Sequence, residues 1–404
     1  MQELPRMEDS VAMGNILVSE FEDPIKHEVK IYDETLRDGE QTIGVVFSPE
    51  QKVEIARGLL EAGVRDMTVG FPAVSEIERE TVRRIVELKQ TDGMWCLARA
   101  LSSDIDAVLA SNISNVVMFI AISDCHLKHK LKMDVDRAFD QMQEQIRMAT
   151  ARGLNVRFSF EDASRAPFAR VKRFIAGAVE AGASQVAFPD TNGVMTPMAT
   201  HRVVVELLDI IGDIPLIVHL HNDLGMATAN SLVAAAAGAR YIHGALCGLG
   251  ERAGNTSLEE IAVGLQVKYG VDLGVDLGAL TALAQRVAEM AKFQLGHNKP
   301  VLGRNVFAHE SGIHVHGVSR EVTTYEPYPP EIVGRQHEFY YGKHSGISSI
   351  RYVASEHDIE CGDDDIIATL AAVKAMAEAE GGRNPDQAEV ADMLRARAAE
   401  SPAS

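Results

Sequence analysis

The chain has 404 residues, of which 46% are hydrophobic and 24% charged, so it can bury one large core and leave residues for a smaller domain. Its formal net charge of −19 repels a phosphate backbone at long range, which argues against nucleic acid as the main partner. No run reaches the roughly 18–20 apolar residues of a membrane span, and the four cysteines are scattered without CxxC spacing. We expect a cytoplasmic protein without a membrane partner, with a flexible, polar N-terminal arm at residues 1–28 that is not a signal peptide.

Short apolar segments alternate with helical patterns from residue 29 onward, which predicts eight parallel βα units. Two helices are predicted to begin with a capping residue and a proline, at Ser48-Pro49 and Thr196-Pro197, and several end at glycine. Eight such units match a closed (β/α)8 TIM barrel over residues 29–275. An open doubly wound sheet is the alternative, but no expected strand is followed by a dinucleotide GxGxxG motif. The strands are expected at residues 29–32, 66–69, 94–97, 115–120, 156–160, 185–188, 216–220 and 241–245.

The pattern changes beyond residue 275. An Ala-rich helical segment is followed by a stretch rich in glycine and histidine at residues 307–317 and by a proline-rich link at residues 325–330. We expect residues 276–395 to form a helical linker and small, mainly helical C-terminal subdomains, with a polar tail at residues 396–404. The expected fold class is therefore α/β, a TIM barrel followed by these subdomains.

The seventh expected strand ends in His219 and His221, two imidazoles that point to the same side of a strand and can bind one metal ion. The alternative is a pair of satisfied histidines at a strand end. Two other loops carry compatible side chains: Arg37 and Asp38 follow the first strand, and Asn255 ends a glycine-rich turn after the eighth. Because a barrel gathers the C-terminal ends of its strands at one mouth, we expect these side chains to lie together.

Four segments in this order resemble the 2-isopropylmalate synthase and homocitrate synthase family, and the likeness covers residues 29–350. The segments are Leu36 to Gln41, His219 to Gly225, Gly248 to Asn255 and His309 to His314. That family condenses an acyl-CoA, usually acetyl-CoA, with a 2-oxo acid on a metal-dependent barrel. The resemblance implies an acyltransferase, and the chain looks most similar to the short homocitrate synthases of the nitrogen-fixation type.

The resemblance also assigns roles to single residues. Arg37 matches the residue that polarises the keto oxygen, Thr191 the hydroxyl that holds the carboxylate of the 2-oxo acid, and Glu161 an active-site acid. A Claisen condensation needs a base, an electrophile and stabilisation of the developing alkoxide, and the base is left unassigned. The residues that match the metal ligands are Asp38, His219, His221 and Asn255.

Two further implications concern cofactor and assembly. A carboxylate, two imidazoles and an amide suit Mg, Mn or Zn without choosing among them. His314 and Tyr325 match residues that the family's small subdomain brings over the barrel of the partner subunit. The working unit is therefore expected to be a homodimer with shared active sites.

The identity of the 2-oxo acid is left open by the sequence. Residues 123–132 form a basic loop in an acidic protein, and His126 or Lys128 could receive a second acidic group. Such a group occurs in 2-oxoglutarate, oxaloacetate and phosphonopyruvate but not in 3-methyl-2-oxobutanoate, the substrate of 2-isopropylmalate synthase. The alternative is a solvated helix start. No residues remain for a leucine-sensing domain after residue 404, so we expect no feedback by leucine.

Two other functions, a lyase and an inactive barrel, fit these residues less well. An acyl-CoA lyase running the reverse reaction shares the barrel, but such lyases carry a catalytic cysteine in a glycine-rich loop, and Gly248 to Asn255 has none. A catalytically dead barrel would be expected to lose ligands, and all four are present. Glu251 and Arg252 either shape their loop or contact the substrate.

Overall fold

The computed structural model describes residues 20, 21, 23–88 and 91–400, so the expected arm lies mostly outside the described residues. The chain divides into two compact units, of which the first ends at Leu295 and the second begins at Gly296. Each is described by itself below. None of the helices in the described parts is both long and apolar enough to cross a membrane.

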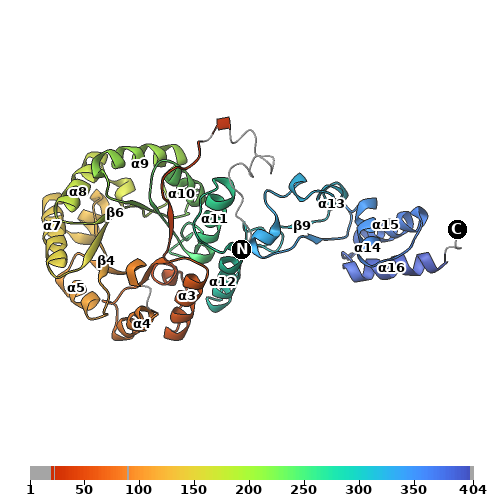
Figure 1. The fold of residues 1–404 in the computed structure, drawn as a ribbon, viewed down its shortest axis with the longest axis horizontal. Coiled ribbons are helices and arrows are strands. Elements are labelled where there is room, and N and C mark those ends of the chain that lie inside the picture. Colours follow the sequence, from red (N-terminus) through yellow and green to blue (C-terminus); the bar gives the residue numbers. More distant parts are fainter. Residues whose placement is uncertain (1–19, 22, 89–90, 401–404) are drawn as a thin grey trace. The chain divides into compact units, whose positions relative to one another are not determined.

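Eight parallel strands in sequence order form a closed barrel in the first unit (Figure 1). The last strand closes the barrel by pairing with the first, with Tyr32 opposite His243 and Asp33 opposite Gly244. All eight expected strands are present within two residues of their predicted ends, and the predicted TIM barrel is confirmed. The strands are β1 (Lys30–Asp33), β2 (Asp66–Gly70), β3 (Met94–Arg99), β4 (Asn115–Ala121), β5 (Asn155–Glu161), β6 (Gln185–Asp190), β7 (Leu216–Leu220) and β8 (Tyr241–Gly244).

Helices surround the barrel, and their ends follow the predicted signals (Figure 1). Ser48 accepts a hydrogen bond from the Gln51 N–H at the start of the first of them, and Thr196 caps another in the same way. Gly63 ends a helix with a φ of +93°, and a Cβ there would lie 2.2 Å from a backbone oxygen. The helices are α3 (Pro49–Glu61), α4 (Glu76–Val86), α5 (Ser102–Leu109), α6 (Asp124–His126), α7 (Val135–Ala151), α8 (Phe168–Glu180), α9 (Pro197–Ile211), α10 (Ala227–Ala236), α11 (Leu258–Val263) and α12 (Leu277–Met290).

The barrel interior holds a separate cluster of buried side chains, Tyr32, Trp95, Leu97 and Val117, from β1, β3 and β4. Arg157 of β5 lies over the rings of Tyr32 and Trp95. Because β5 does not neighbour β1 or β3 in the sheet, these contacts cross the interior of the barrel. The barrel is therefore filled by side chains, as expected for this fold.

The second unit is mainly helical, as predicted. Its core packs Val315, Phe339, Ile350, Val373 and Leu394 together. One short pair of parallel strands adds to the helices. Helical structure continues to residue 400, into the segment expected to be a tail. The elements are β9 (Ala308–His309), α13 (Gly312–Val318), β10 (Glu338–Phe339), α14 (Ile347–Glu356), α15 (Asp363–Glu378) and α16 (Gln387–Glu400).

Candidate metal and active site

A cavity of about 340 Å³ opens at the C-terminal ends of the strands, and residues from all eight strands or the loops after them line it. Parallel strands direct their C-terminal ends to the same mouth, so loops far apart in sequence converge there. Six of the residues expected in the site line this cavity, namely Arg37, Asp38, Glu161, Thr191, His219 and His221.

Asp38, His219 and His221 form one compact group of possible metal ligands, all buried. Nε2 of His219 lies 3.6 Å from Oδ2 of Asp38, and Nε2 of His221 lies 3.8 Å from the same oxygen. The two Nε2 atoms are 3.3 Å apart. Ligand atoms from the loop after β1 and from the C-terminal end of β7 therefore converge, in keeping with the His-x-His spacing.

Asn255 lies beside this group, joined to His221 by an isolated β-bridge. Its Nδ2 donates to Oδ2 of Asp38 at 2.7 Å and to the Leu249 carbonyl at 2.8 Å. Within the described chain its Oδ1 is buried without a hydrogen-bond partner. Buried polar atoms normally have a partner, so a free amide oxygen next to a carboxylate and two imidazoles fits a divalent cation.

The charge states of these groups also suit metal binding. Burial alone would raise the pKa of the Asp38 carboxyl, but Arg37 and the two histidines hold it well below its usual range. Burial and the neighbouring His219 lower the pKa of His221 to about 4. Asp38 is therefore an anion and His221 neutral near pH 7, the forms in which both bind metals.

Arg37 is held in place by two carboxylates. Its Nη2 lies 2.6 Å from Oε2 of Glu34, and its Nη1 lies 3.1 Å from Oδ1 of Asp38. Glu34 is 1% exposed and also contacts Nδ1 of His243 at 3.0 Å. Burial would raise the pKa of Glu34, but Arg37 and His243 lower it to about 2, so this carboxylate is ionised.

Glu34 and His243 were not predicted as site residues, although both line the cavity. The available signals were weak: Glu34 precedes Arg37 by three residues, and His243 alternates with Tyr241 along β8. His243 also lies close to a metal-ligand candidate, with its Nδ1 3.3 Å from Nδ1 of His219. Burial lowers the pKa of His243 to about 3, so the ring is neutral.

The acid and hydroxyl that were predicted after β5 and β6 lie at the same mouth. Glu161 accepts hydrogen bonds from Nζ of Lys130 at 2.6 and 2.8 Å. Oγ1 of Thr191 accepts a hydrogen bond from the Asp162 N–H at 2.9 Å, which leaves the hydroxyl proton of Thr191 free to be donated.

The basic loop after β4 turns one of its lysines toward the cavity. Nδ1 of His126 lies 3.6 Å from Oε1 of Glu161. The chain then forms a π-helical turn at Leu127–Leu131. Lys130 of this turn lines the cavity, whereas His126 contacts Glu161 and is not among the described residues that line the cavity. Lys128 is exposed and is not among the described residues that line the cavity.

Arg252 joins three loops. It pairs with Asp223 at 2.8 Å and donates from Nη2 to the Thr191 carbonyl at 2.6 Å. These contacts connect the loops after β6, β7 and β8. These contacts fit the loop-shaping alternative, and Glu251 and Arg252 also line the cavity, so contact with a substrate stays open as the second alternative.

His314 and Tyr325 lie in the second unit, where the structure brings them together. Their rings stack with centroids 4.0 Å apart and planes 18° apart. Nearby, the ring of His309 is 5.7 Å from that of His314, and its Nε2 lies 3.0 Å from Oε1 of Glu326. Tyr325 is 43% exposed, so this stacked pair is open to solvent on the isolated unit.

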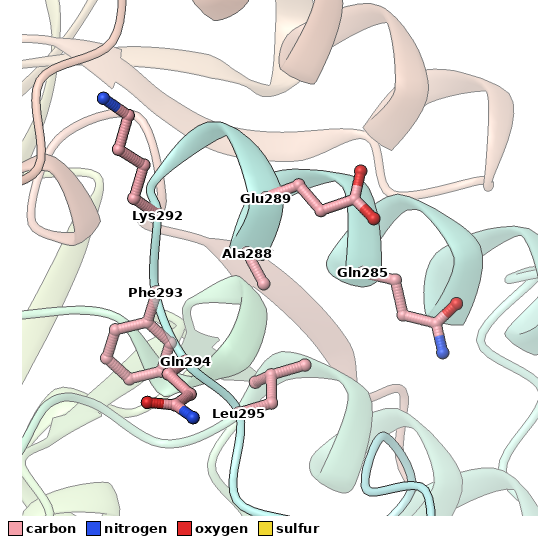
Figure 2. A pocket seen from close by; sticks show the side chains of 7 residues that line it. All are labelled: Gln285, Ala288, Glu289, Lys292, Phe293, Gln294 and Leu295. Atoms are coloured by element: carbon pink, nitrogen blue, oxygen red, sulfur yellow. The ribbon is translucent and has the colours of Figure 1, made fainter.

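A second hollow of about 390 Å³ lies at the C-terminal end of α12 (Figure 2). Figure 2 shows Glu289 and Lys292 extending in different directions. Among its described lining residues there is no imidazole and no pair of carboxylates, so we do not assign chemistry to it. The residues are Gln285, Ala288, Glu289, Lys292, Phe293, Gln294 and Leu295.

The fold and the cavity define a TIM-barrel enzyme with a buried set of metal ligands at its mouth. A family model described as HMGL-like matches residues 28–287, and one described as homocitrate synthase post-HMGL domain-like matches residues 301–381. The chain belongs to the HMGL-like family, and within it to the 2-isopropylmalate and homocitrate synthase group of acyltransferases.

Individual relatives are similar along most of the chain. Homocitrate synthase AksA of Methanopyrus kandleri is 43% identical over 87% of this chain and 88% of its own length. The 2-isopropylmalate synthase of Sulfolobus acidocaldarius is 40% identical over 87% of this chain and 91% of its own. Among solved structures, hydroxymethylglutaryl-CoA lyase from Pseudomonas aeruginosa has a TM-score of 0.58 at 22% identity, covering 65% of this chain and 92% of its own. That last likeness concerns the fold alone.

Proposed function

We propose that the protein condenses acetyl-CoA with a 2-oxo acid and releases CoA. The carrying observation is that a guanidinium, Arg37, and a metal-ligand group of Asp38, His219 and His221 share one cavity. In this reaction the acetyl methyl group loses a proton and forms a carbon–carbon bond to the keto carbon, whose oxygen becomes a hydroxyl. Water then hydrolyses the thioester, giving a 2-hydroxy di- or tricarboxylic acid.

Asp38, His219, His221 and Asn255 would hold the divalent metal. When bound, such a cation polarises the keto oxygen and orients the 2-oxo acid. Arg37 stabilises the negative charge that develops on the same oxygen, because Glu34 and Asp38 already hold its guanidinium in position. A donor that is already in position does not have to reorganise during the reaction. It can therefore stabilise the transition state more than the bound substrate.

Thr191 would hold the carboxylate of the 2-oxo acid. Its oxygen is already occupied by the Asp162 N–H, so its O–H is available to donate to an anion. Glu161 is the proposed acid of the site, and Nζ of Lys130 donates hydrogen bonds to both oxygens of its carboxyl group. Neither residue is assigned as the base that removes the methyl proton.

His314 and Tyr325 would complete the site from the second unit of a partner subunit in a homodimer. The stacked pair leaves Tyr325 43% exposed, and the neighbouring Ile313 is 72% exposed. An exposed aromatic and aliphatic patch is typical of surfaces that become covered in an assembly. The exposure of Tyr325 and Ile313 therefore supports the proposal that this segment contacts a partner subunit.

The 2-oxo acid is proposed to carry a second acidic group, as in a homocitrate synthase. His126 and Lys128 were the predicted recognition residues, and the position of Lys130 at the cavity supports the same loop with a different lysine. Condensation on oxaloacetate or phosphonopyruvate uses the same chemistry. The alternative is a 2-isopropylmalate synthase, which the 40% identity to the enzyme of that name from S. acidocaldarius supports. An acyl-CoA lyase is supported by the fold alone.

A panel of 2-oxo acids tests this function. Purified protein with acetyl-CoA and Mn²⁺ or Mg²⁺ should release free CoA thiol with 2-oxoglutarate, oxaloacetate or phosphonopyruvate faster than with 3-methyl-2-oxobutanoate. A preference for the branched-chain acid would instead identify a 2-isopropylmalate synthase. No thiol release with any acid would contradict the condensation.

A further inference from the structure

A chain of side-chain contacts connects Arg37 to the barrel interior, and its deeper members have no role in the reaction proposed above. Oε2 of Glu34 holds Arg37, and Oε1 of Glu34 lies 3.0 Å from Nδ1 of His243. On the other edge of the same ring, Nε2 of His243 lies 3.3 Å from Nη1 of Arg157. His243 is 3% exposed and Arg157 is 0% exposed, so protein groups and not bulk water set these contacts.

The contacts with Arg157 and Glu34 together determine where the ring of His243 carries its proton. A guanidinium can only donate hydrogen bonds, so the nitrogen that faces it, Nε2, has to accept. A carboxylate can only accept, so the nitrogen that faces Glu34 has to donate. The proton therefore lies on Nδ1, and the Nδ1–H donates to Oε1 of Glu34 at 3.0 Å, which is nearer than Nδ1 of His219 at 3.3 Å. The Thr68 hydroxyl donates to the same carboxylate oxygen at 2.9 Å.

Arg157 is itself held firmly. Its guanidinium lies 4.2 Å from the ring centroid of Tyr32 and 4.3 Å from that of Trp95, and its Nε donates to Gln185 at 2.7 Å. A cation between two aromatic faces has favourable electrostatics and little freedom to move. Arg157 therefore keeps a donor in place against Nε2 of His243.

We propose that His243 is a positioning residue for Arg37, acting through Glu34. Without the Nδ1–H, Oε1 of Glu34 is left with the Thr68 hydroxyl as its donor, so the carboxylate is held less firmly. The guanidinium of Arg37, which is bound to Oε2 of Glu34, is then no longer held where it can contact the keto oxygen. This inference rests on the proposed function, because that function assigns the role of Arg37. The contacts between Arg37, Glu34, His243 and Arg157 do not depend on that assignment.

Two variants of His243 separate donation from packing. His243→Asn keeps a side-chain N–H near the position of Nδ1–H, whereas His243→Phe keeps a ring of similar size and removes the donor. At saturating Mn²⁺, His243→Phe should lose about 10- to 100-fold in kcat, the usual scale for outer-shell groups. His243→Asn should recover most of that loss, and both variants should keep the KM for acetyl-CoA. A kcat of His243→Phe close to the wild type would overturn the proposal, as would an equal loss in both variants when circular dichroism shows both folded.

A second measurement needs neither turnover nor substrate. Nitrogen-15 NMR of the histidine rings in the metal-free protein should show His243 as the neutral Nδ1–H tautomer, assigned by its absence from His243→Asn. Arg157→Met removes the donor that faces Nε2 but leaves the Glu34 carboxylate facing Nδ1, so this variant should keep the Nδ1–H and serves as the control. An Nε2–H or doubly protonated His243 in the wild type would refute the proposal. If the wild type releases no CoA with any 2-oxo acid, the proposed function fails, and this spectrum still decides whether an Nδ1–H faces Glu34.

Discussion

The barrel mouth and the second unit present their expected catalytic side chains in different ways. At the mouth, Asp38 is 3% exposed and His221 7%, and neighbouring charges shift the pKa values of both. In the second unit, His314 and Tyr325 touch each other, and Tyr325 is 43% exposed. The side chains at the mouth are buried among partners of their own chain, whereas the ring of Tyr325 is partly exposed to solvent.

This difference separates two kinds of catalytic contribution. Burying charged groups is unfavourable unless they are paired, so the carboxylates, guanidinium and imidazoles of the mouth are arranged as a network that fits a cation. A stacked histidine and tyrosine need no such network to remain folded. The mouth is therefore suited to hold and polarise a substrate, whereas a catalytic role for the exposed pair of the second unit stays a prediction.

Of the changes that test this comparison, metal removal should have the largest effect on turnover. Chelation should abolish CoA release, because Asp38, His219, His221 and Asn255 converge on one position. Elemental analysis of the chelated protein and recovery of activity on adding Mn²⁺ or Mg²⁺ provide the control. Full turnover by protein verified to be metal-free would show that the mouth does not depend on a cation.

Arg37→Ala is expected to have the next largest effect. Removing a donor that stabilises charge in the transition state costs about 10²–10³ in turnover. The variant should bind Mn²⁺, measured by calorimetry, because Asp38, His219 and His221 remain, and circular dichroism verifies that it is folded. Arg37→Lys is the matched control, since it keeps the charge but loses the two-point contact with Glu34, and it should recover only part of the rate. Near-normal turnover of Arg37→Ala would contradict its role.

The sequence alone predicts the barrel and most of the metal-ligand group because their signals are local. The alternation of strands and helices identifies the fold, and His219 and His221 face one side because they are two apart in a strand. Arg37 and Asp38 directly follow β1, so the barrel geometry places them at the mouth. These positions can therefore be predicted without knowing which strands pair.

Glu34 and His243 depend on pairing between distant strands. β8 joins β1 only when the barrel closes, with Tyr32 opposite His243, and until then neither residue indicates the other. The lysine of the basic loop is a different case. The sequence places Lys128 and Lys130 in one basic segment without distinguishing them, and only the folded turn shows that Lys130 lines the cavity.

That pair of lysines offers the next test. If the loop receives a second acidic group, Lys130→Gln should raise the KM for a dianionic 2-oxo acid by about ten- to a hundredfold, because a charge-assisted contact is worth roughly 1.5–3 kcal/mol. Lys128→Gln is the matched control on the same turn, and its KM should change less. A larger change for Lys128 would favour the residue predicted from sequence. No change in either would show that the loop is solvated.

The smallest expected signal tests the comparison most directly. If His314 of one subunit acts at the barrel of the other, a dimer of one Arg37→Ala and one His314→Ala subunit holds one site with both defects and one with none. Random reassortment makes half of the dimers mixed, so the mixture should recover about a quarter of wild-type activity. Mixing Arg37→Ala with His221→Ala is the control, because both defects lie in the barrel and no dimer then contains an intact one. Mass spectrometry verifies that subunits have exchanged. If both mixtures stay inactive after exchange, the second unit covers the barrel of its own chain, and its exposed pair needs no partner subunit.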